Sequence, residues 1–316
     1  MKNKYFGDIN DYYKYGLLRI LCNHGEIRTA VCWMRTLDDG RSKGQVPEYL
    51  QQRDKYKSLD AELFESLTRC LKHPSHRSIR LARRPGILPF AVPYEALLPH
   101  DADKRRQYFR RFLAKARDRD CHLVFFDPDT GLKLMWSPRT GKTSSAHLYL
   151  DELQMIFDAG HSVLFYQHFP YKPRDQFVRD LASGLCQLCH VPTVFAFPTP
   201  KVVFLLVPQL HLIDYFHRRS QEVAQTWKNR IGLAPHQGAV KVLPSRAMVD
   251  LDLQIHGVLR LRAMRTGMSI SELVNDAVRR TLGEDAEDLA AFEERAKEPN
   301  LLFESVLKDL RKRGKL

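Results

Sequence analysis

No run of apolar residues in this 316-residue sequence approaches the roughly 18 that a membrane-spanning helix requires. The first residues, Met-Lys-Asn-Lys-Tyr-Phe-Gly-Asp, also lack the apolar segment of a secretion signal. These two absences argue against a membrane partner and against export. We therefore expect a cytoplasmic protein.

Cysteine is sparse and dispersed, with six residues in the whole chain, so we predict buried apolar side chains and no disulfide framework. Cys186-Gln-Leu-Cys189-His190 has the spacing of a haem-attachment motif, but covalent haem attachment requires export. A lone C-x-x-C also lacks the second pair of a zinc site. Neither haem nor zinc is predicted.

Glycine-rich phosphate loops are missing as well. Arg139-Thr-Gly-Lys-Thr143 resembles the end of a P-loop, but Trp136 stands where the first glycine is required, which argues against triphosphate binding. An apolar strand over Thr29 to Met34 is followed by Asp38-Asp39-Gly40 instead of G-x-G-x-x-G. That turn lies where a nucleotide-binding fold meets its cofactor, and it is equally consistent with an ordinary Asp-Gly turn.

Positive charge is abundant. Fifty Lys and Arg against 37 Asp and Glu give a net charge of +13. Because cationic side chains neutralise phosphates, this excess favours a nucleic-acid partner over a charge that serves solubility alone. Many of these cations lie in residues 103–119, around a predicted apolar stripe: Lys104, Arg105, Arg106, Arg110, Arg111, Lys115, Arg117 and Arg119. This helix is either a solvated face or a phosphate-binding surface.

Apolar patterns predict alternating strands and helices before about residue 225. Strands are expected at 29–34, 123–126, 162–169, 191–197 and 201–207, and helices at 8–25, 58–72, 103–119, 148–158 and 173–186. The last two strands suggest an antiparallel end. The predicted fold class is α/β, a doubly wound Rossmann-like domain.

The stretch His122 to Leu132 is the centre of this domain. Leu123 to Phe126 predict a strand buried on both faces, which ends in Asp127-Pro128-Asp129. Ligands of open α/β sheets bind at the carboxyl ends of strands, so a site is favoured over a plain turn. The strand that begins at Ser162 also ends in polar groups. We take Asp127, Asp129 and His168 as candidate catalytic residues.

The first predicted helix has a polar entrance with more polar groups than one cap requires. We take Asp8, Asn10, Asp11 and Lys14, together with Asp39 and Gly40, as candidate cofactor-binding residues. Capping alone is the alternative. Hard oxygen ligands suit Mg²⁺, so a metal-assisted reaction using the acids and His168 is a further alternative, although no dedicated metal site is predicted.

Three motifs together resemble a group of uncharacterised bacterial proteins that are themselves similar to Rossmann-fold methyltransferases of the rRNA adenine-N6 type and to three-Cys-motif partner proteins. They are Gly7-Asp8-x-Asn10-Asp11-x-x-Lys14, Phe126-Asp-Pro-Asp-Thr-Gly-Leu132 and Tyr166-Gln-His-Phe169. The resemblance covers residues 1–220 and implies S-adenosylmethionine as cofactor. In those enzymes Asp-Pro-Pro-Tyr holds the target amine; here Asp129-Thr130 replace Pro-Tyr, which removes the base-stacking ring.

The last 70 or so residues predict a different unit. Arg246 to Asp252 read as a short strand, a helix follows Asp252, and Ser269-Ile-Ser-Glu272 is a capping box that opens a second helix. One short strand and two helices bury too little apolar surface alone. Dimerisation through the strand is therefore expected.

Strand-helix-helix with Gly267-x-Ser269-x-Ser271-Glu272 resembles the ribbon-helix-helix family of CopG-like antitoxins. The resemblance implies a homodimer that reads DNA with Arg246, Met248 and Asp250, while amides at Ser269 and Ser271 hold a phosphate. Asp250 opposes phosphate, which weakens this expectation. The tail resembles a toxin-wrapping segment that would bind a RelE/ParE-like toxin through Leu289, Phe292 and Phe303; a solvated helix is the alternative.

The predicted organisation is a methyltransferase-like domain (1–225), a linker (226–242), a ribbon-helix-helix module (243–283) and a partner-binding tail (284–316). The first hypothesis is a DNA-binding regulator or antitoxin fused to a methyltransferase-like domain. The second is an active S-adenosylmethionine-dependent nucleic-acid methyltransferase, or a metal-dependent enzyme, targeted by the small module. Two neighbouring reading frames fused by error are a third possibility.

Overall fold

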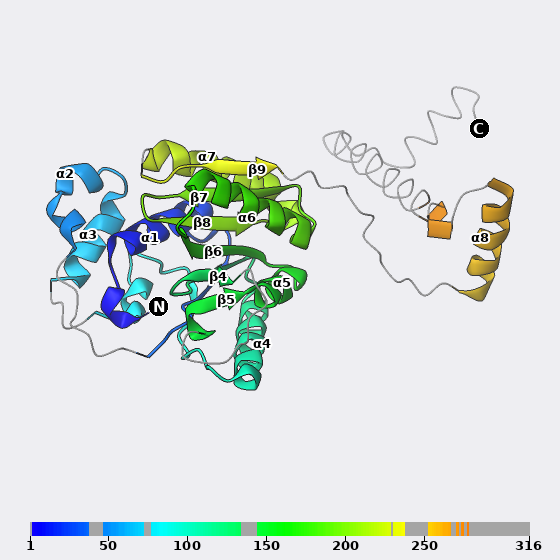
Figure 1. Cartoon of the computed structure of the whole chain (residues 1–316), viewed down its shortest axis with the longest axis horizontal. Helices are drawn as coiled ribbons and strands as arrows, with labels where there is room; N and C mark the ends of the chain where they lie inside the picture. The colour runs from blue at the N-terminus through cyan, green and yellow to red at the C-terminus, as the bar shows by residue number, and fades with distance from the viewer. Residues whose placement is uncertain are drawn as a thin grey trace, which may run out of the picture. The chain divides into compact units, whose positions relative to one another are not determined.

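The computed structural model describes residues 2–37, 47–72, 77–133, 144–228, 230–237 and 252–266, together with residues 270, 271, 273, 274 and 277. The chain divides into two compact units, residues 1–244 and 245–316 (Figure 1). Nine predicted site residues lie outside the described residues: Asp39, Gly40, Arg246, Met248, Asp250, Ser269, Leu289, Phe292 and Phe303.

In the described part of the first unit, seven strands form one sheet in the order β2-β1-β3-β6-β8-β7-β9. Their bounds are β1 Thr29–Cys32, β2 Val92–Tyr94, β3 Leu123–Phe126, β6 Ser162–His168, β7 Thr193–Pro198, β8 Val202–Val207 and β9 Ala234–Gln237. β2, β1, β3 and β6 are parallel, and β8 pairs antiparallel with both β6 and β7. A separate parallel pair joins β4 (Gly131–Lys133) to β5 (His147–Tyr149).

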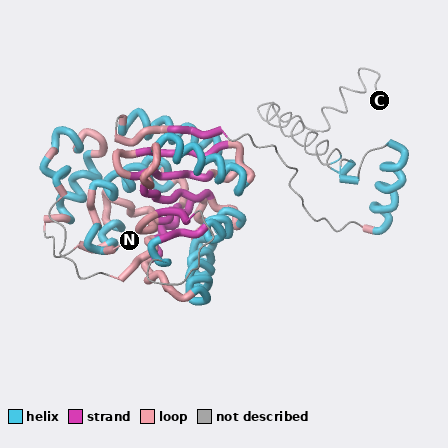
Figure 2. The backbone as a smooth tube through the Cα atoms, viewed as in Figure 1, coloured by secondary structure: helices cyan, strands magenta, loops and turns pink. Residues whose placement is uncertain are grey.

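Helices cover both faces of this sheet, as Figures 1 and 2 show. Their bounds are α1 Ile9–Leu21, α2 Arg53–Tyr56, α3 Ala61–Cys70, α4 Ala102–Asp118, α5 Leu150–Asp158, α6 Arg174–Cys189 and α7 Ile213–Trp227. One apolar core joins α1, α3 and α7 to the sheet, and a second joins α4, α5 and α6 to its opposite face. The predicted α/β class and the helical cover on both faces are therefore confirmed.

Alternation along the strands explains the two cores. Leu123 and Phe125 of β3 belong to the α1 side, whereas Val124 and Phe126 belong to the α4 side. All four side chains are fully buried, so the predicted two-faced burial of this strand is correct. β1 comes first in the chain, and its neighbours β2 and β3 lie on opposite sides of it. The sheet thus has its switch point at the ends of β1 and β3, where such folds bind ligands.

Besides the short strands β2, β4 and β5, which were not predicted, two further features of the first unit differ from the sequence prediction. β9 falls inside residues 226–242, which were expected as linker, and pairs with β7 at the sheet edge. Proline disfavours strands except at edges, which is why Ala234-Pro-His-Gln237 gives no strand pattern. Arg105 is fully buried, not on the cationic surface of α4, because both its Nε and Nη2 atoms pair with Glu152.

In the second unit the structure describes α8 (Leu253–Thr266), which begins directly after Asp252 as predicted. Ile255 of this helix is 54% exposed, and Val258 is 64% exposed. Beyond α8, residues 270, 271, 273, 274 and 277 are helical, with Leu273 buried and Ser271 and Ala277 exposed.

None of the described helices is long and apolar enough to cross a membrane.

Candidate functional site

A cavity of about 370 Å³ opens at the carboxyl ends of β3 and β6, beside the start of α1. We call it the site cavity. The residues that line it are Lys2, Tyr5, Asp8, Asn10, Asp11, Lys14, Asp127, Pro128, Asp129, Tyr166 and His168. Seven of these were sequence candidates, from segments up to 160 residues apart, and the fold brings them to one place.

The entrance of α1 is held by two aspartates with different tasks. Asp8 is the N-cap, and its Oδ1 accepts a hydrogen bond from the Asp11 amide at 2.8 Å. Gly7 precedes it with a φ of 79°, and a Cβ there would lie 2.6 Å from Leu71 Cδ1. Glycine is therefore required for this turn, which aims the Gly7 amide at Asp11 Oδ2, 2.8 Å away.

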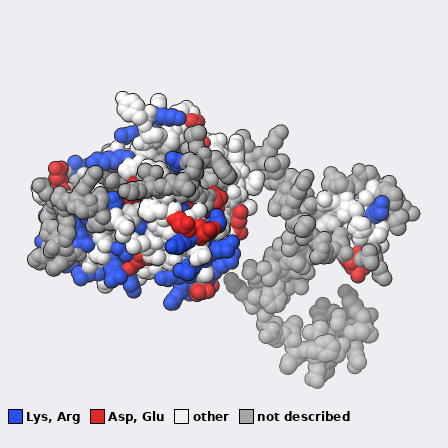
Figure 3. Space-filling view, turned by 60° about the horizontal axis from the view of Figure 1, so that its bottom comes forward, with Lys and Arg blue, Asp and Glu red and all other residues white. Residues whose placement is uncertain are grey.

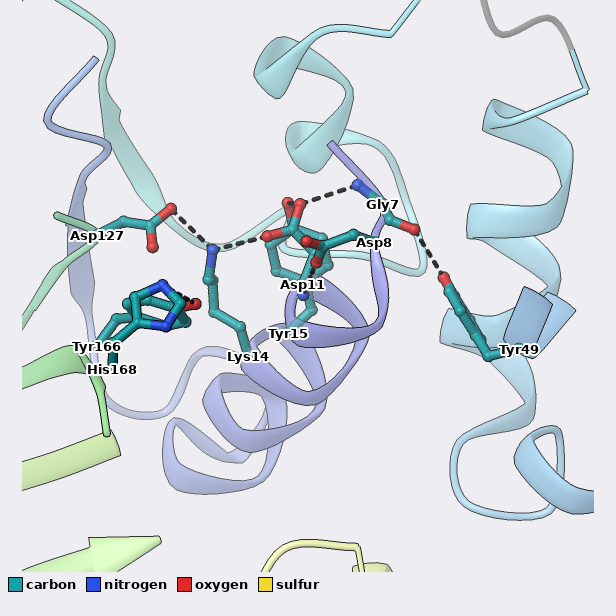
Figure 4. Close-up of polar contacts among 9 residues, drawn as sticks. All are labelled: Gly7, Asp8, Asp11, Lys14, Tyr15, Tyr49, Asp127, Tyr166 and His168. Carbon is teal, nitrogen blue, oxygen red and sulfur yellow. Dashed lines mark hydrogen bonds and ion pairs between the residues drawn. The ribbon is translucent and has the colours of Figure 1, made fainter. Parts of the chain in front are cut away.

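Lys14 lies between two carboxylates from distant parts of the chain (Figure 4). Its Nζ is 2.6 Å from Asp11 Oδ1 and 2.7 Å from Asp127 Oδ2, and all three side chains are buried. Burial alone lowers the pKa of a lysine, but here the two carboxylates outweigh it and raise the pKa of Lys14. The ammonium group therefore stays charged and links α1 to the end of β3.

Asp8 is a carboxyl group in the cavity whose pKa lies near neutral pH. Burial raises its pKa, the neighbouring charges of Asp11 and Asp127 raise it further, and the Asp11 amide and Lys14 oppose them. The result is a pKa of about 7. Burial also raises the pKa of Asp127, although its direct contact with Lys14 opposes the rise, whereas Asp8 has no direct contact with Lys14. A carboxyl group with this pKa can give and take protons near neutrality.

Tyr166 and His168 form the wall contributed by β6. Residues two apart on a strand share a face, and the Tyr166 hydroxyl lies 3.1 Å from His168 Nε2. Their rings meet edge to face, with centroids 5.0 Å apart (Figure 4). Partial loss of hydration lowers the pKa of His168, so its exposed ring is a neutral surface at neutral pH.

The loop after β3 is fastened to both neighbouring strands. Thr36, just beyond β1, donates to Asp129 Oδ2 at 2.9 Å. On the other side, Gln167 accepts from the Leu132 amide at 2.7 Å, and a Cβ on Gly131 would lie 2.3 Å from that Gln167 oxygen. Hydrogen bonds to the neighbouring strands therefore fix the position of Asp129.

A further acceptor lies at the end of β2, one strand from β1. Glu95 Oε2 pairs with Arg80 Nε at 3.1 Å, while the buried Oε1 has no hydrogen-bond partner among the described residues. In Rossmann-type folds an acid near this point accepts the ribose hydroxyls of an adenosine-containing cofactor. Glu95 is an acid at the corresponding strand end. No sequence signal identified it, because the short strand Val-Pro-Tyr before it is not distinctive.

The structure also bears on the metal-assisted alternative. Among the described residues, no three His, Cys, Asp or Glu side chains are grouped so as to hold a metal ion. At the centre of the acidic cluster, Lys14 is the counter-ion of Asp11 and Asp127.

Sequence reasoning missed Lys2, Tyr5, Pro128 and Tyr166 as lining residues. A signal existed for Tyr166, because strand alternation places it on the same face as His168. No local pattern indicated Lys2 or Tyr5.

The comparisons with known proteins identify no family for this chain. No protein-family model and no curated protein matches the chain. Among solved structures, a Legionella pneumophila protein assigned to family DUF519 is similar over 74% of this chain and 98% of its own, with a TM-score of 0.38 and 11% identity. Likeness at this level does not define a shared fold or function.

Proposed function

We propose that residues 1–244 form an enzyme that modifies a nucleic acid, of the S-adenosylmethionine-dependent methyltransferase type, and that the C-terminal module directs it to DNA. The observation that supports this most is the convergence of Asp8, Asp127 and His168 in one cavity at the carboxyl ends of β3 and β6. The net charge of +13 agrees with a polyanionic substrate.

The residues of the cavity suit a base amine as the reacting group. Asp127 and the chain around Pro128 offer acceptors for an amine, as Asp-Pro does in the methyltransferases that this motif resembles. An amine that gains a methyl group loses a proton, and Asp8, with a pKa of about 7, can take it. In the resembling methyltransferases a tyrosine ring stacks on the base, and this chain has Asp129-Thr130 in place of that Pro-Tyr. The exposed ring of His168, backed by Tyr166, supplies a stacking surface instead.

The cofactor expected from the resemblance is S-adenosylmethionine, which when bound would supply the methyl group. Glu95 would accept its ribose hydroxyls. Burial raises the pKa of Asp127, and Lys14 opposes that rise and holds the carboxylate toward α1 at 2.7 Å, so the acceptor is in place before the substrate arrives.

The test is binding and transfer with the full chain. We expect S-adenosylmethionine binding by calorimetry, weakened in Glu95→Gln, and label transfer from the cofactor to nucleic acid. The rate should rise with pH through about 7, and Asp8→Asn should lose that rise. Arg119→Gln, an exposed change at the end of α4, is the control. Absence of both binding and transfer would remove methyl transfer as the function.

A second candidate is a ribbon-helix-helix regulator or antitoxin that binds DNA and a RelE/ParE-like toxin. The specific observation in its favour is α8, which begins directly after Asp252 and exposes Ile255 and Val258. Retardation of the DNA upstream of its own gene by the full chain, abolished in Arg246→Ala, would support it. No retardation at low salt would exclude autoregulation.

A further inference from the structure

A second cavity, of about 630 Å³, adjoins the site cavity and shares Tyr5, Asp8 and Asn10 with it. We call it the tyrosine cavity. Four tyrosines and four cations line it, with two acids among them: Tyr5, Tyr13, Tyr49 and Tyr56; Lys4, Arg77, Lys201 and Arg230; and Asp8 and Glu48. One acid is Asp8, which is partly protonated near neutral pH. The balance of charge in this cavity is therefore positive.

Contacts within the protein fix the positions of rings and cations in the tyrosine cavity. The Arg230 guanidinium lies over the Tyr56 ring, 5.2 Å from its centroid. Arg77 is held by the Lys4 carbonyl, to which Nη1 donates at 3.2 Å. Tyr5 is 45% exposed and stands at the boundary with the site cavity. A flat ring with open area beside fixed cations suits stacked bases and phosphates.

A third cavity, of about 610 Å³, continues from the tyrosine cavity and shares Pro200 and Lys201 with it. We call it the loop cavity, because most of its lining is the segment from the end of β6 to the first residue of α6, Phe169 to Arg174. Three cations and no acid are among its lining residues: Lys172, Arg174 and Lys201. Tyr171 is fully exposed to solvent, which is unusual for an aromatic side chain.

We propose that the loop cavity and the tyrosine cavity form one track that leads a single strand of nucleic acid into the site cavity. Neighbouring cavities share lining residues, and the exposed rings of Tyr171 and Tyr5 line the loop cavity and the boundary between the tyrosine and site cavities. A single strand offers unpaired base faces to such rings, whereas a duplex does not. This inference rests on the proposed function for its substrate class and adds where that substrate binds and in which form.

The track is distinct from the cationic surface that the sequence suggested. In the view of Figure 3, Lys and Arg side chains are spread over the first unit with acidic ones among them, so charge alone does not single out one path. α4 carries many cations, but its aromatic side chains Tyr108, Phe109 and Phe112 are buried. Cations and exposed rings coincide in the track.

The test is fluorescence anisotropy with the full chain and a labelled single-stranded RNA of ~12 nucleotides at several salt concentrations. RNA avoids interference from the C-terminal module, which is expected to read the major groove of duplex DNA. Removing a cation that neutralises one phosphate lowers the slope of log affinity against log salt by about 0.7. We expect that decrease for Lys201→Gln and for Arg230→Gln, and no change for Arg110→Gln on α4.

Replacing the rings gives an independent readout. Tyr5→Leu and Tyr171→Leu should weaken binding by roughly 5- to 100-fold without altering the salt slope, because stacking is uncharged. Lys201 and Tyr171 are exposed, so their replacement leaves the core untouched even if another variant fails to fold.

The outcomes separate the two proposals. If RNA binds but the slope changes in Arg110→Gln and not in Lys201→Gln, the track is wrong and the proposed function stands. Equal or tighter binding of an RNA duplex of the same sequence would also overturn the track. If the full chain binds no RNA at low salt, the track is overturned, and methyl transfer to DNA then decides the proposed function.

Discussion

At the scale of single residues, the site depends on how three carboxylates share one ammonium group. Asp11 accepts hydrogen bonds from the Gly7 amide, the Tyr15 hydroxyl and Lys14, so its oxygens are fully engaged. Asp127 has Lys14 as its ion-pair partner. Asp8 has the Asp11 amide as a donor and a pKa raised to about 7, so it can exchange protons near neutral pH.

The first prediction concerns stability and pH. The pKa of Asp8 is about 7 in the folded chain, above its ordinary value of 3.8, so near pH 5 to 6 the folded state binds a proton that the unfolded state does not. Stability should therefore fall as pH rises between about 4 and 7 and should level off above 7. Asp8→Asn should flatten this part of the profile, measured as Tm against pH. An unchanged slope in the variant would mean that Asp8 titrates normally.

The second prediction is that Lys14→Met destabilises the first unit strongly. Removing one partner of a buried ion pair leaves uncompensated charge and costs about 3–5 kcal/mol, which lowers Tm by roughly 10 °C in a unit of this size. Lys57→Gln is the matched control, because Lys57 and Glu65 form an exposed pair at 2.8 Å. That change should cost at most ~1 kcal/mol.

Adding Asp127→Asn to Lys14→Met should recover part of the stability, since it removes one of the stranded charges. If the double variant is less stable than Lys14→Met alone, charge compensation is not what Lys14 supplies.

At the scale of elements, α1 is the helix that connects the site to the core. Its first turn provides Asp8 and Asp11, and its middle packs against α7 through Gly16 and Trp227. Glycine inside a helix is ordinarily unfavourable by about 1 kcal/mol relative to alanine. Here a Cβ on Gly16 would lie 1.9 Å from Trp227 Cζ2, so close packing requires it.

The third prediction follows from this contact. Gly16→Ala should cost about 1–3 kcal/mol by overpacking, which exceeds the gain in helix propensity. Gly184→Ala in α6 is the control, because nothing lies within 4 Å of a Cβ built there. It should stabilise the chain by about 0.5–1 kcal/mol. Denaturant unfolding of both variants tests the pair; equal effects would contradict the packing argument.

Sequence patterns located the elements well where the signal was local. β3 has the predicted bounds, α4 begins one residue before its predicted start and ends one residue before its predicted end, and β6 ends one residue early. β2, β9 and the β4–β5 pair were missed. They are three or four residues long and contain little periodicity, so pairing with a neighbour defines them and no local pattern does.

At the scale of the whole molecule, two units share one chain. The first has a complete three-layer core, whereas α8 of the second exposes Ile255 and Val258. The ribbon-helix-helix resemblance predicts that this unit pairs with a second copy.

The fourth prediction is that the full chain is a dimer in solution. Light scattering after size exclusion should give twice the 36.8 kDa chain mass, and Val258→Glu should shift it to the monomer. His256→Gln, an exposed polar change on the same helix, should leave the mass unchanged. A wild-type chain that stays monomeric at ~50 μM would contradict dimerisation through this unit.

The sequence by itself determined the α/β class, the two-faced burial of β3 and a first helix with a polar, capped entrance, because apolar periodicity and capping depend on residues within a few positions of one another. It also supplied most candidates for the site. Only the tertiary structure decided that they meet: Lys14 and Asp127 are 113 positions apart. It also decided that Arg105 is buried, that Asp8 has a raised pKa and that tyrosines line a neighbouring cavity. Contact, burial and charge between distant segments set these properties, and no local pattern encodes them.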